Sequence, residues 1–233
     1  MSLKSCVSLR DIRFGFGPQQ DVLNIAALDV QRGERLFIQG PSGSGKSTLL
    51  GVIGGVLTPT AGTVTVLGES LNAMSAARRD RFRADHIGFV FQQFNLLPYL
   101  NVLDNVTLPL EFSPLRRKRA LEGGQTPALV AKELLRMLDL NDSRLLKRAA
   151  TELSVGQQQR VAVARALIGS PELIIADEPT SALDTDTRER FLTLLFDACA
   201  QSGITVLFVS HDHTLKGAFD RVLDLNVLNA VPA

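Results

Sequence analysis

The segment GPSGSGKST, at residues 40–48, is the most informative part of the chain about its fold. It follows the apolar segment RLFIQG and precedes STLLGVIGGVL, whose apolar residues recur at helical spacing. The pattern fits the phosphate-binding loop G-x-x-x-x-G-K-[ST], in which successive backbone N–H groups turn inward around phosphate oxygens. A strand, this loop and a helix in that order predict an α/β protein of the P-loop NTPase class, and the alternation of strands and helices along the chain predicts a mostly parallel sheet core.

Each part of this loop has a predicted role. Lys46 adds a positive charge beside the β- and γ-phosphates of a nucleotide, and the hydroxyl of Ser47 is placed to bind Mg²⁺. A helix beginning at Gly45 directs its N-terminal dipole at the same anion. The alternative, a chance glycine-rich turn, does not explain the position between a strand and a helix. We expect nucleotide contacts from Gly40, Pro41, Ser42, Gly43, Ser44, Gly45, Lys46, Ser47 and Thr48.

Composition places the chain among ordinary globular proteins. The 233 residues are 45% hydrophobic and 21% charged, so a core can form without disulfides or structural metals. A net charge of +1 gives no general attraction to nucleic acid. Cys6 and Cys199 match no metal or redox spacing, which favours a reducing compartment. We expect neither a secretion signal nor a membrane-spanning segment.

Strand and helix signals alternate along the chain. An antiparallel β part is expected at the N-terminus, and a helical subdomain is expected to be inserted in the α/β core. Residues 93–153 hold much helical pattern, with Leu134, Leu135 and Leu138 on one face, and a further helix is expected from Gly156 to Gly169. Strands are expected at 7–14, 25–30, 35–40, 61–68, 86–91, 172–177 and 204–210. Two further helices are expected at about 75–84 and 185–201.

Two apolar strands end in side chains that suit catalysis. In ELIIADE, Asp177 is placed to hold Mg²⁺, and Glu178 is then free to polarise an attacking water molecule. In LFVSHD, His211 follows a strand of the same sheet and is expected to contact the γ-phosphate and the water. The alternative for Asp177 and Glu178 is that they only cap the next helix. The alternative for His211 is a structural or surface role.

Gln92 ends the strand IGFVF where the helical subdomain begins. Its amide is suited to sense Mg²⁺ or the attacking water while it links the core to the subdomain. A glutamine without a catalytic role is the equal alternative. Two basic segments are expected to be solvated, although the first is also suited to anionic headgroups: LRRKRA at 115–120, and the cluster Arg78, Arg79, Arg81 and Arg83.

In their order and rough spacing, GPSGSGKST, FQQFNLLP, LSVGQQQR, LIIADEPTSALD and VSHD resemble the ATPase subunits of ABC transporters. The resemblance covers nearly the whole chain, and LSVGQQQR is its most specific part because other phosphate-loop ATPases lack this signature segment. IGFVFQQFNLLPYLNVLDNVTLPL and ADEPTSALD are most similar to the subgroup of lipoprotein release and macrolide export (LolD/MacB-like). The resemblance implies a single domain over 1–233, with a RecA-like core and β subdomain in 1–92 and 161–233 and a helical subdomain in 93–160.

The resemblance also implies a head-to-tail homodimer that holds two ATP molecules at its interface. Ser154 and the backbone N–H of Gly156, with Gln157, would bind the γ-phosphate held by the opposite subunit. Asp184 would communicate between the two sites. The three glutamines at 157–159, an unusual start for a core helix, are then expected to face the interface or solvent.

The residues that match the family's adenine-stacking position and its signature segment each leave a question open. Phe16 matches the family's adenine-stacking aromatic residue, usually tyrosine; Phe14 is an alternative stacking residue, and core packing is an alternative role for Phe16. The commonest signature is Leu-Ser-Gly-Gly-Gln, but Val155 replaces its first glycine here. A β-branched residue would clash if this position used φ > 0 or approached the phosphate closely. We expect ATP-driven closure to survive, because Ser154 and Gly156 are retained.

The resemblance implies a cycle of ATP-driven dimerisation, hydrolysis through Glu178 and reopening of the dimer. This cycle would power a separate transmembrane permease of the MacB, LolC/E or FtsX kind. A periplasmic adaptor is a further candidate partner. Export or extraction from the membrane or periplasm is expected, at the cytoplasmic face of the inner membrane. A short permease helix is expected to enter a groove lined by Gln92–Tyr99, notably Phe94, Leu96, Leu97 and Tyr99.

Three other functions compete with transport. An ABC-type ATPase acting on DNA or ribosomes would carry long coiled coils or two cassettes in one chain, and this chain has neither. A phosphate-loop kinase or GTPase would not explain LSVGQQQR. Regulation of a membrane partner without transport, as in cell-division signalling, stays open.

Overall fold

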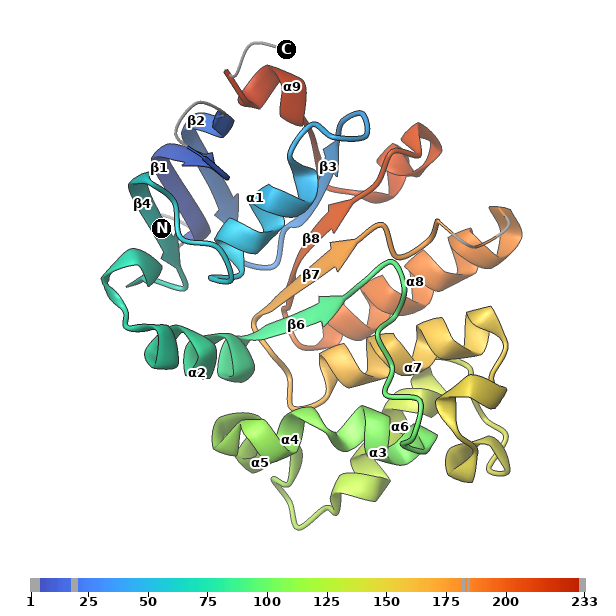
Figure 1. Ribbon diagram of the computed structural model, residues 1–233. Coiled ribbons are helices and arrows are strands. Elements are labelled where there is room, and N and C mark those ends of the chain that lie inside the picture. Colours follow the sequence, from blue (N-terminus) through green and yellow to red (C-terminus); the bar gives the residue numbers. More distant parts are fainter. Residues whose placement is uncertain (1–4, 18–20, 182, 184, 231–233) are drawn as a thin grey trace. The chain divides into compact units, whose positions relative to one another are not determined.

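The computed structural model describes residues 5–17, 21–181, 183 and 185–230. The chain divides into two compact units, whose helices and strands are labelled in Figure 1. The first unit comprises Met1–Arg83 and Thr205–Ala233, and the second comprises Ala84–Ile204. Each unit has its own strands and its own buried apolar core.

The N-terminal part of the first unit is an antiparallel sheet with the strand order β2-β1-β4-β5. In its register, Val7 of β1 lies opposite Val30 of β2 and Val66 of β4. All three side chains are buried, as the period of two along a strand requires when one face packs on a core. This confirms the predicted antiparallel β part, whose strands are β1 (Ser5–Gly15), β2 (Asp21–Gln31), β4 (Ala61–Val66) and β5 (Glu69–Ser70).

The first unit also contains parallel strands, in which β3 (Arg35–Gln39) pairs with both β8 (Thr205–Val209) and β9 (Arg221–Asp224). The apolar residues at 36–38 are fully buried, as is typical of strands covered on both faces. The rings of Phe37, Phe208 and Phe219 form one aromatic cluster, with centroids 5.0–6.2 Å apart. The remaining elements of the unit are α1 (Lys46–Ile53), the 3₁₀ turns Leu71–Ala73 and His213–Ala218, and α9 (Leu225–Leu228).

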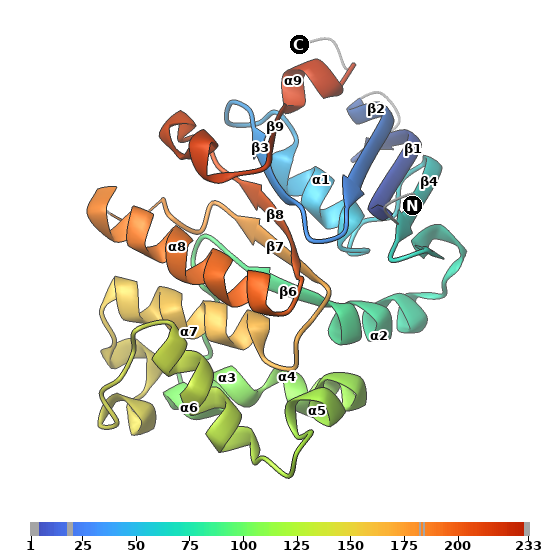
Figure 2. The ribbon, with the colours of Figure 1, turned by 180° about the vertical axis from the view of Figure 1, so that it is seen from behind.

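The second unit pairs β6 (Ile87–Val90) in parallel with β7 (Leu173–Asp177), and most of its remaining elements are helices. The helix α7 (Val155–Leu167) is central, because it packs against β6, α3, α6 and α8 (Figure 2). Its residues 161–164 are fully buried. The unit's other helices are α3 (Val102–Thr107), α4 (Pro109–Phe112), α5 (Pro114–Ala120), α6 (Pro127–Met137) and α8 (Thr185–Gln201), and its 3₁₀ turns are Leu145–Lys147 and Ala150–Glu152. The boundary between the two units falls within α2 (Ala76–His86).

The structure confirms the predicted fold class, with parallel strands, an N-terminal antiparallel sheet and helical segments. Leu135 in α6 and Leu138, the C-cap of that helix, are buried as the helical spacing predicts, and Leu134 is half-buried. The expectation that the basic segment 115–120 is solvated is wrong for Arg116, which is only 3% exposed. Its guanidinium reaches the backbone carbonyls at the end of α7, a contact between segments about fifty residues apart.

Candidate active site

The predicted phosphate loop connects β3 to α1 in the first unit. Gly45 is the N-cap of α1 and has φ of 95°, a left-handed backbone that favours glycine. The helix itself begins at Lys46, one residue later than predicted. No side chain caps this N-terminus, so its first backbone N–H groups are available to an anion.

Lys46 lies against the loop and is only 7% exposed. Its Nζ donates hydrogen bonds to the carbonyl oxygens of Gly40 at 2.8 Å and Pro41 at 2.7 Å. The hydroxyl of Ser44 is buried and has no hydrogen-bond partner. A buried cation, an unpartnered hydroxyl and an uncapped helix N-terminus together are the donors that a phosphate group requires.

The first unit also holds Phe16, Ser47 and His211. Phe16 is 73% exposed, whereas Phe14 is 7% exposed and packs edge-on against it at a centroid distance of 5.1 Å. Phe14 is therefore a core residue, and Phe16 is the one with a ring face open to a ligand. Ser47 in the first turn of α1 is exposed, as is His211 beyond β8.

The two predicted carboxylates lie at the end of β7 in the second unit. Asp177 is the last residue of the strand, and Glu178 follows it; both are half-buried. Glu178 has φ of 46°, a left-handed conformation that is uncommon outside glycine and is concentrated at functional sites. Gln92, also in this unit, lies exposed just beyond β6.

The signature segment begins α7. Ser154 is the N-cap: its Oγ accepts a hydrogen bond from Gln157 N at 3.4 Å, and Gln157 Oε1 accepts one from Ser154 N at 3.0 Å. This capping box satisfies two donors and leaves the helix N-terminus exposed. A side chain at Gly156 would meet nothing within 4 Å, so this turn presents bare backbone to a ligand.

Val155 does not have the positive φ at which a β-branched side chain would clash with the backbone. It is the first residue of α7, with helical backbone and a side chain that is 47% exposed. Within the second unit, therefore, the valine causes no strain.

The expectation that all three signature glutamines face an interface or solvent is wrong for Gln159, which is 1% exposed. Its Nε2 donates to Pro179 O at 2.8 Å. Gln158 is half-buried and donates to Leu153 O at 3.0 Å. Helical periodicity separates these side chains, because neighbouring positions are about 100° apart around the helix axis.

The predicted residues fall into two groups. The loop at 40–48, Phe16 and His211 belong to the first unit, whereas Gln92, Asp177, Glu178 and residues 154–157 belong to the second. Asp184 lies outside the described residues. No cluster of three or more His, Cys, Asp or Glu side chains suited to a metal occurs among the described residues.

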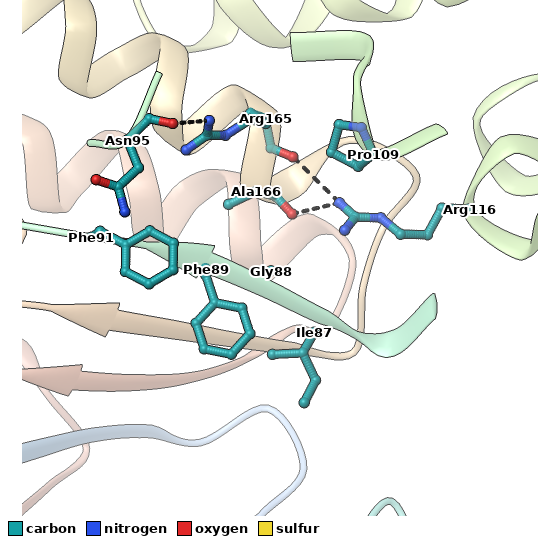
Figure 3. A pocket seen from close by; sticks show the side chains of 9 residues that line it. All are labelled: Ile87, Gly88, Phe89, Phe91, Asn95, Pro109, Arg116, Arg165 and Ala166. Carbon is teal, nitrogen blue, oxygen red and sulfur yellow. Dashed lines mark hydrogen bonds between the residues drawn. The ribbon is translucent and has the colours of Figure 1, made fainter. Parts of the chain in front are cut away.

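A pocket that the sequence did not predict lies wholly within the second unit (Figure 3). It measures about 210 Å³, and its lining consists of Ile87, Gly88, Phe89, Phe91, Asn95, Pro109, Arg116, Arg165 and Ala166. Phe89 and Phe91 stack with centroids 5.5 Å apart and form an apolar wall. Of the predicted groove stretch 92–99, Asn95 lines this pocket, while Phe94 is buried and Tyr99 is 77% exposed.

Two arginines fix the opposite side of this pocket. Arg165 donates to Phe94 O and Asn95 O, both at 2.6 Å, and Phe94 and Asn95 both have positive φ. Arg116 donates to Ala166 O at 2.7 Å and to Ile168 O at 2.8 Å. Burial lowers the pKa of Arg165. Burial also lowers the pKa of Arg116, to about 10, so Arg116 stays charged at neutral pH. Sequence spacing alone could not reveal these long-range contacts.

Across the part of the chain that the structure describes, every helix is too short or too polar to cross a bilayer.

Comparison with known proteins adds a family assignment to this geometry. The family described as "ABC transporter" matches residues 23–181. The "Uncharacterized ABC transporter ATP-binding protein Rv0986" of Mycobacterium tuberculosis is 40% identical over 215 residues, which are 92% of this chain and 83% of that protein. The "Macrolide export ATP-binding/permease protein MacB" of Shigella flexneri is 39% identical over 222 residues, which are 94% of this chain and 33% of that protein.

A solved structure agrees over nearly the whole chain. It is the dimeric, post-hydrolysis ATP-binding cassette MJ0796 of Methanocaldococcus jannaschii, bound to ADP and Pi. Its TM-score is 0.78 and its identity 39%, with 94% of this chain and 93% of that chain covered.

Proposed function

Because the chain belongs to the ABC transporter family as an ATP-binding ATPase subunit, we propose that it works as an ATP-driven homodimer powering a separate membrane permease. The observation that carries the proposal is the phosphate loop. There the buried Lys46, the unpartnered hydroxyl of Ser44 and the uncapped N-terminus of α1 supply the donors for a nucleotide's phosphates. The dimeric state of MJ0796 supports the proposed assembly.

In the proposed complex, each ATP is bound by two copies of the chain. One copy contributes the loop 40–48, with Phe16 stacking on adenine through its exposed ring. The other copy contributes Ser154 and the backbone N–H of Gly156, with Gln157 and the positive end of α7 behind them. Asp184 is assigned the role of communicating between the two sites. Loss of the γ-phosphate removes these contacts, so hydrolysis reopens the dimer.

For hydrolysis we assign the base to Glu178, whose carboxylate accepts a proton from the attacking water. His211 donates to the γ-phosphate and orients the water, and Gln92 positions the water from the other strand. Mg²⁺, when bound, neutralises charge on the β- and γ-phosphate oxygens. Its proposed ligands are Ser47, Asp177 and Gln92, all oxygen donors of the kind that Mg²⁺ prefers.

The pocket between Phe89, Phe91 and Arg165 is the proposed docking site for a short helix of the permease. Its apolar wall suits an apolar side chain, and Asn95 at its rim offers an amide to the helix backbone. Since the described part of the chain has no membrane-spanning helix, the transport path is assigned to the permease. Docking places the ATPase at the cytoplasmic face of the inner membrane.

The likeness to MacB, named for macrolide export, favours export or extraction over import. A permease of the MacB, LolC/E or FtsX kind, with or without a periplasmic adaptor, fits this subgroup. If the chain instead regulates a membrane partner, ATP hydrolysis and permease binding would persist without movement of any substrate across reconstituted membranes.

Two substitutions separate binding from chemistry. Lys46→Ala should weaken nucleotide binding by about ten- to a hundredfold, since it removes charge-assisted hydrogen bonds. Glu178→Gln should leave binding intact and lower the hydrolysis rate by about 10²–10⁴-fold, because the base is lost. A fluorescent-nucleotide titration and a phosphate-release assay measure the two effects. Near-normal hydrolysis in Glu178→Gln would refute the assignment of the base.

Permease docking has its own test. Phe91→Asp places a charge on the apolar wall, so it should abolish recruitment of the chain to membranes that contain the co-expressed permease. Phe112→Asp is the matched control, because Phe112 is 65% exposed in the same unit but does not line the pocket. Equal recruitment of both variants would place the docking site elsewhere.

A further inference from the structure

The third signature glutamine, Gln159, is one of the few buried polar side chains in the described residues. It lies in the second turn of α7, where the neighbouring core positions are Val161, Ala162 and other apolar residues. A buried amide costs free energy unless it is hydrogen-bonded, so its partner indicates what it does. That partner is Pro179 O, 2.8 Å from Nε2 and twenty residues along the chain.

Pro179 directly follows Glu178, whose backbone is strained. A left-handed φ of 46° is unfavourable for a non-glycine residue, because its Cβ crowds the neighbouring backbone. The ring of a following proline further restricts the residue before it. Such a conformation persists only where surrounding contacts hold it.

Hydrogen bonds from the turn itself and from α7 act on the backbone of this turn. Ser181 N donates to Glu178 O at a long 3.3 Å, and Gln159 Nε2 donates to Pro179 O at 2.8 Å. The second bond is shorter, is buried, and comes from a helix rather than from the turn itself. It therefore ties the peptide after Glu178 to the rigid, buried body of α7.

We propose that Gln159 is a positioning residue for Glu178: by holding the Pro179 carbonyl, it keeps the left-handed turn that aims the carboxylate. This inference rests on the proposed role of Glu178 as the base. The signature helix then has two tasks. Its exposed N-cap, Ser154, serves the ATP held by a second copy, and its buried Gln159 serves the carboxylate of its own copy.

The test compares Gln159→Met with Arg160→Met. Methionine keeps the length of Gln159 and removes the donor. Arg160 is the matched control, because it is the next residue of α7 and also donates to a backbone carbonyl at 2.8 Å, that of Asp139. Gln159→Met should lower kcat about ten- to a hundredfold with KM for ATP changed less than about twofold, whereas Arg160→Met should leave both within about twofold.

A purely structural role predicts a different outcome. Both variants lose one hydrogen bond, so both should lower the urea midpoint of unfolding. If Gln159→Met lowers that midpoint and leaves kcat unchanged, the proposal is overturned. If Gln159→Met does not fold, Gln159→Glu replaces it. The protonated carboxyl of that variant restores a donor, so its activity relative to the wild type should rise from pH 8 to pH 6; no rise overturns the proposal.

The double variant Gln159→Met/Glu178→Gln distinguishes this proposal from the assignment of the base. If Gln159 acts through Glu178, adding Gln159→Met to Glu178→Gln should lower the residual kcat by less than about twofold. If Gln159→Met lowers kcat as much in the Glu178→Gln variant as in the wild type, positioning through Glu178 is contradicted. Near-normal turnover in Glu178→Gln alone would instead refute the base itself.

Discussion

Arg116 Nε donates a hydrogen bond to the backbone carbonyl of Ile168 at 2.8 Å, which ties α5 to the C-terminal end of α7. A second bond from its guanidinium reaches Ala166 O at 2.7 Å. The last carbonyls of a helix have no partner within the helix, and a cation there also favours the helix dipole. This one buried side chain therefore caps the signature helix.

Replacing Arg116 should accordingly destabilise the protein. Arg116→Met leaves buried carbonyl oxygens without donors, and we expect a loss of about 2–4 kcal/mol in the free energy of unfolding. Lys118→Met on the same helix is the control and should stay within about 0.5 kcal/mol, since Lys118 is exposed. Urea denaturation measures both, and equal effects would contradict the capping role.

Gly169 makes room for Arg116. It has φ of 73°, and a Cβ there would lie 2.6 Å from both the Cβ and the carbonyl oxygen of Arg116. Gly169→Ala should therefore cost about 2–4 kcal/mol, from backbone strain plus overpacking. Gly203→Ala isolates the strain alone, because Gly203 has φ of 62° and nothing within 4 Å. Equal stability of the two variants in thermal unfolding would contradict close packing of Gly169 against Arg116.

Glu172 should make the free energy of unfolding depend on pH in the acid range. Burial alone would raise its pKa, but hydrogen bonds with His86 and Arg119 outweigh burial and lower the pKa from 4.5 to about 2. Because the folded pKa lies below the unfolded one, the unfolded chain binds more protons between these values. The stabilisation is present above about pH 4.5 and is lost as pH falls toward about 2.

We expect Glu172→Gln to lose about 1–2 kcal/mol at pH 7, with allowance for its partial exposure to solvent, and to approach the wild type as pH falls from 4.5 to 3. Urea titrations at pH 7, 4.5 and 3 measure the difference. Glu111→Gln serves as control, since Glu111 forms an exposed ion pair with Arg117. A constant difference for Glu172→Gln across this range would contradict the assignment.

The two N-terminal phenylalanines should respond differently to truncation. Phe16→Ala removes an exposed ring, so it should raise KM for ATP about three- to tenfold and leave stability nearly unchanged. Phe14→Ala opens a cavity in the core and should cost about 3–5 kcal/mol of stability instead. Steady-state kinetics and urea denaturation separate the two effects, and a KM effect confined to Phe14→Ala would reverse the assignment.

The strands, the phosphate loop and the α7 start could be predicted from sequence because each depends on local chemistry. Apolar runs at 35–40 and 172–177 indicate buried strands, and the glycine spacing at 40–45 indicates a loop that needs special backbone angles. Ser154 three residues before Gln157 is a capping-box pattern, and the structure contains that box.

Side chains whose role depends on distant partners could not be predicted. Arg116 lies in a basic run that resembles a solvated surface, and only its proximity to Ala166 and Ile168 makes it a buried cap. Gln159 resembles its neighbours in sequence but meets Pro179, twenty residues away. The left-handed backbone of Glu178 likewise has no local signal, because glutamate seldom adopts it without tertiary contacts.

In the proposed assembly, ATP joins two copies of the chain, with Ser154 of one copy against the phosphate loop of the other. Light scattering of Glu178→Gln with ATP and Mg²⁺ measures the mass of this assembly, since slow hydrolysis preserves the complex. We predict about twice the 25.3 kDa chain mass with ATP, a single-chain mass with ADP, and no ATP-driven dimer after Ser154→Arg is added. A single-chain mass with ATP, or an ATP-driven dimer that survives Ser154→Arg, would contradict the account.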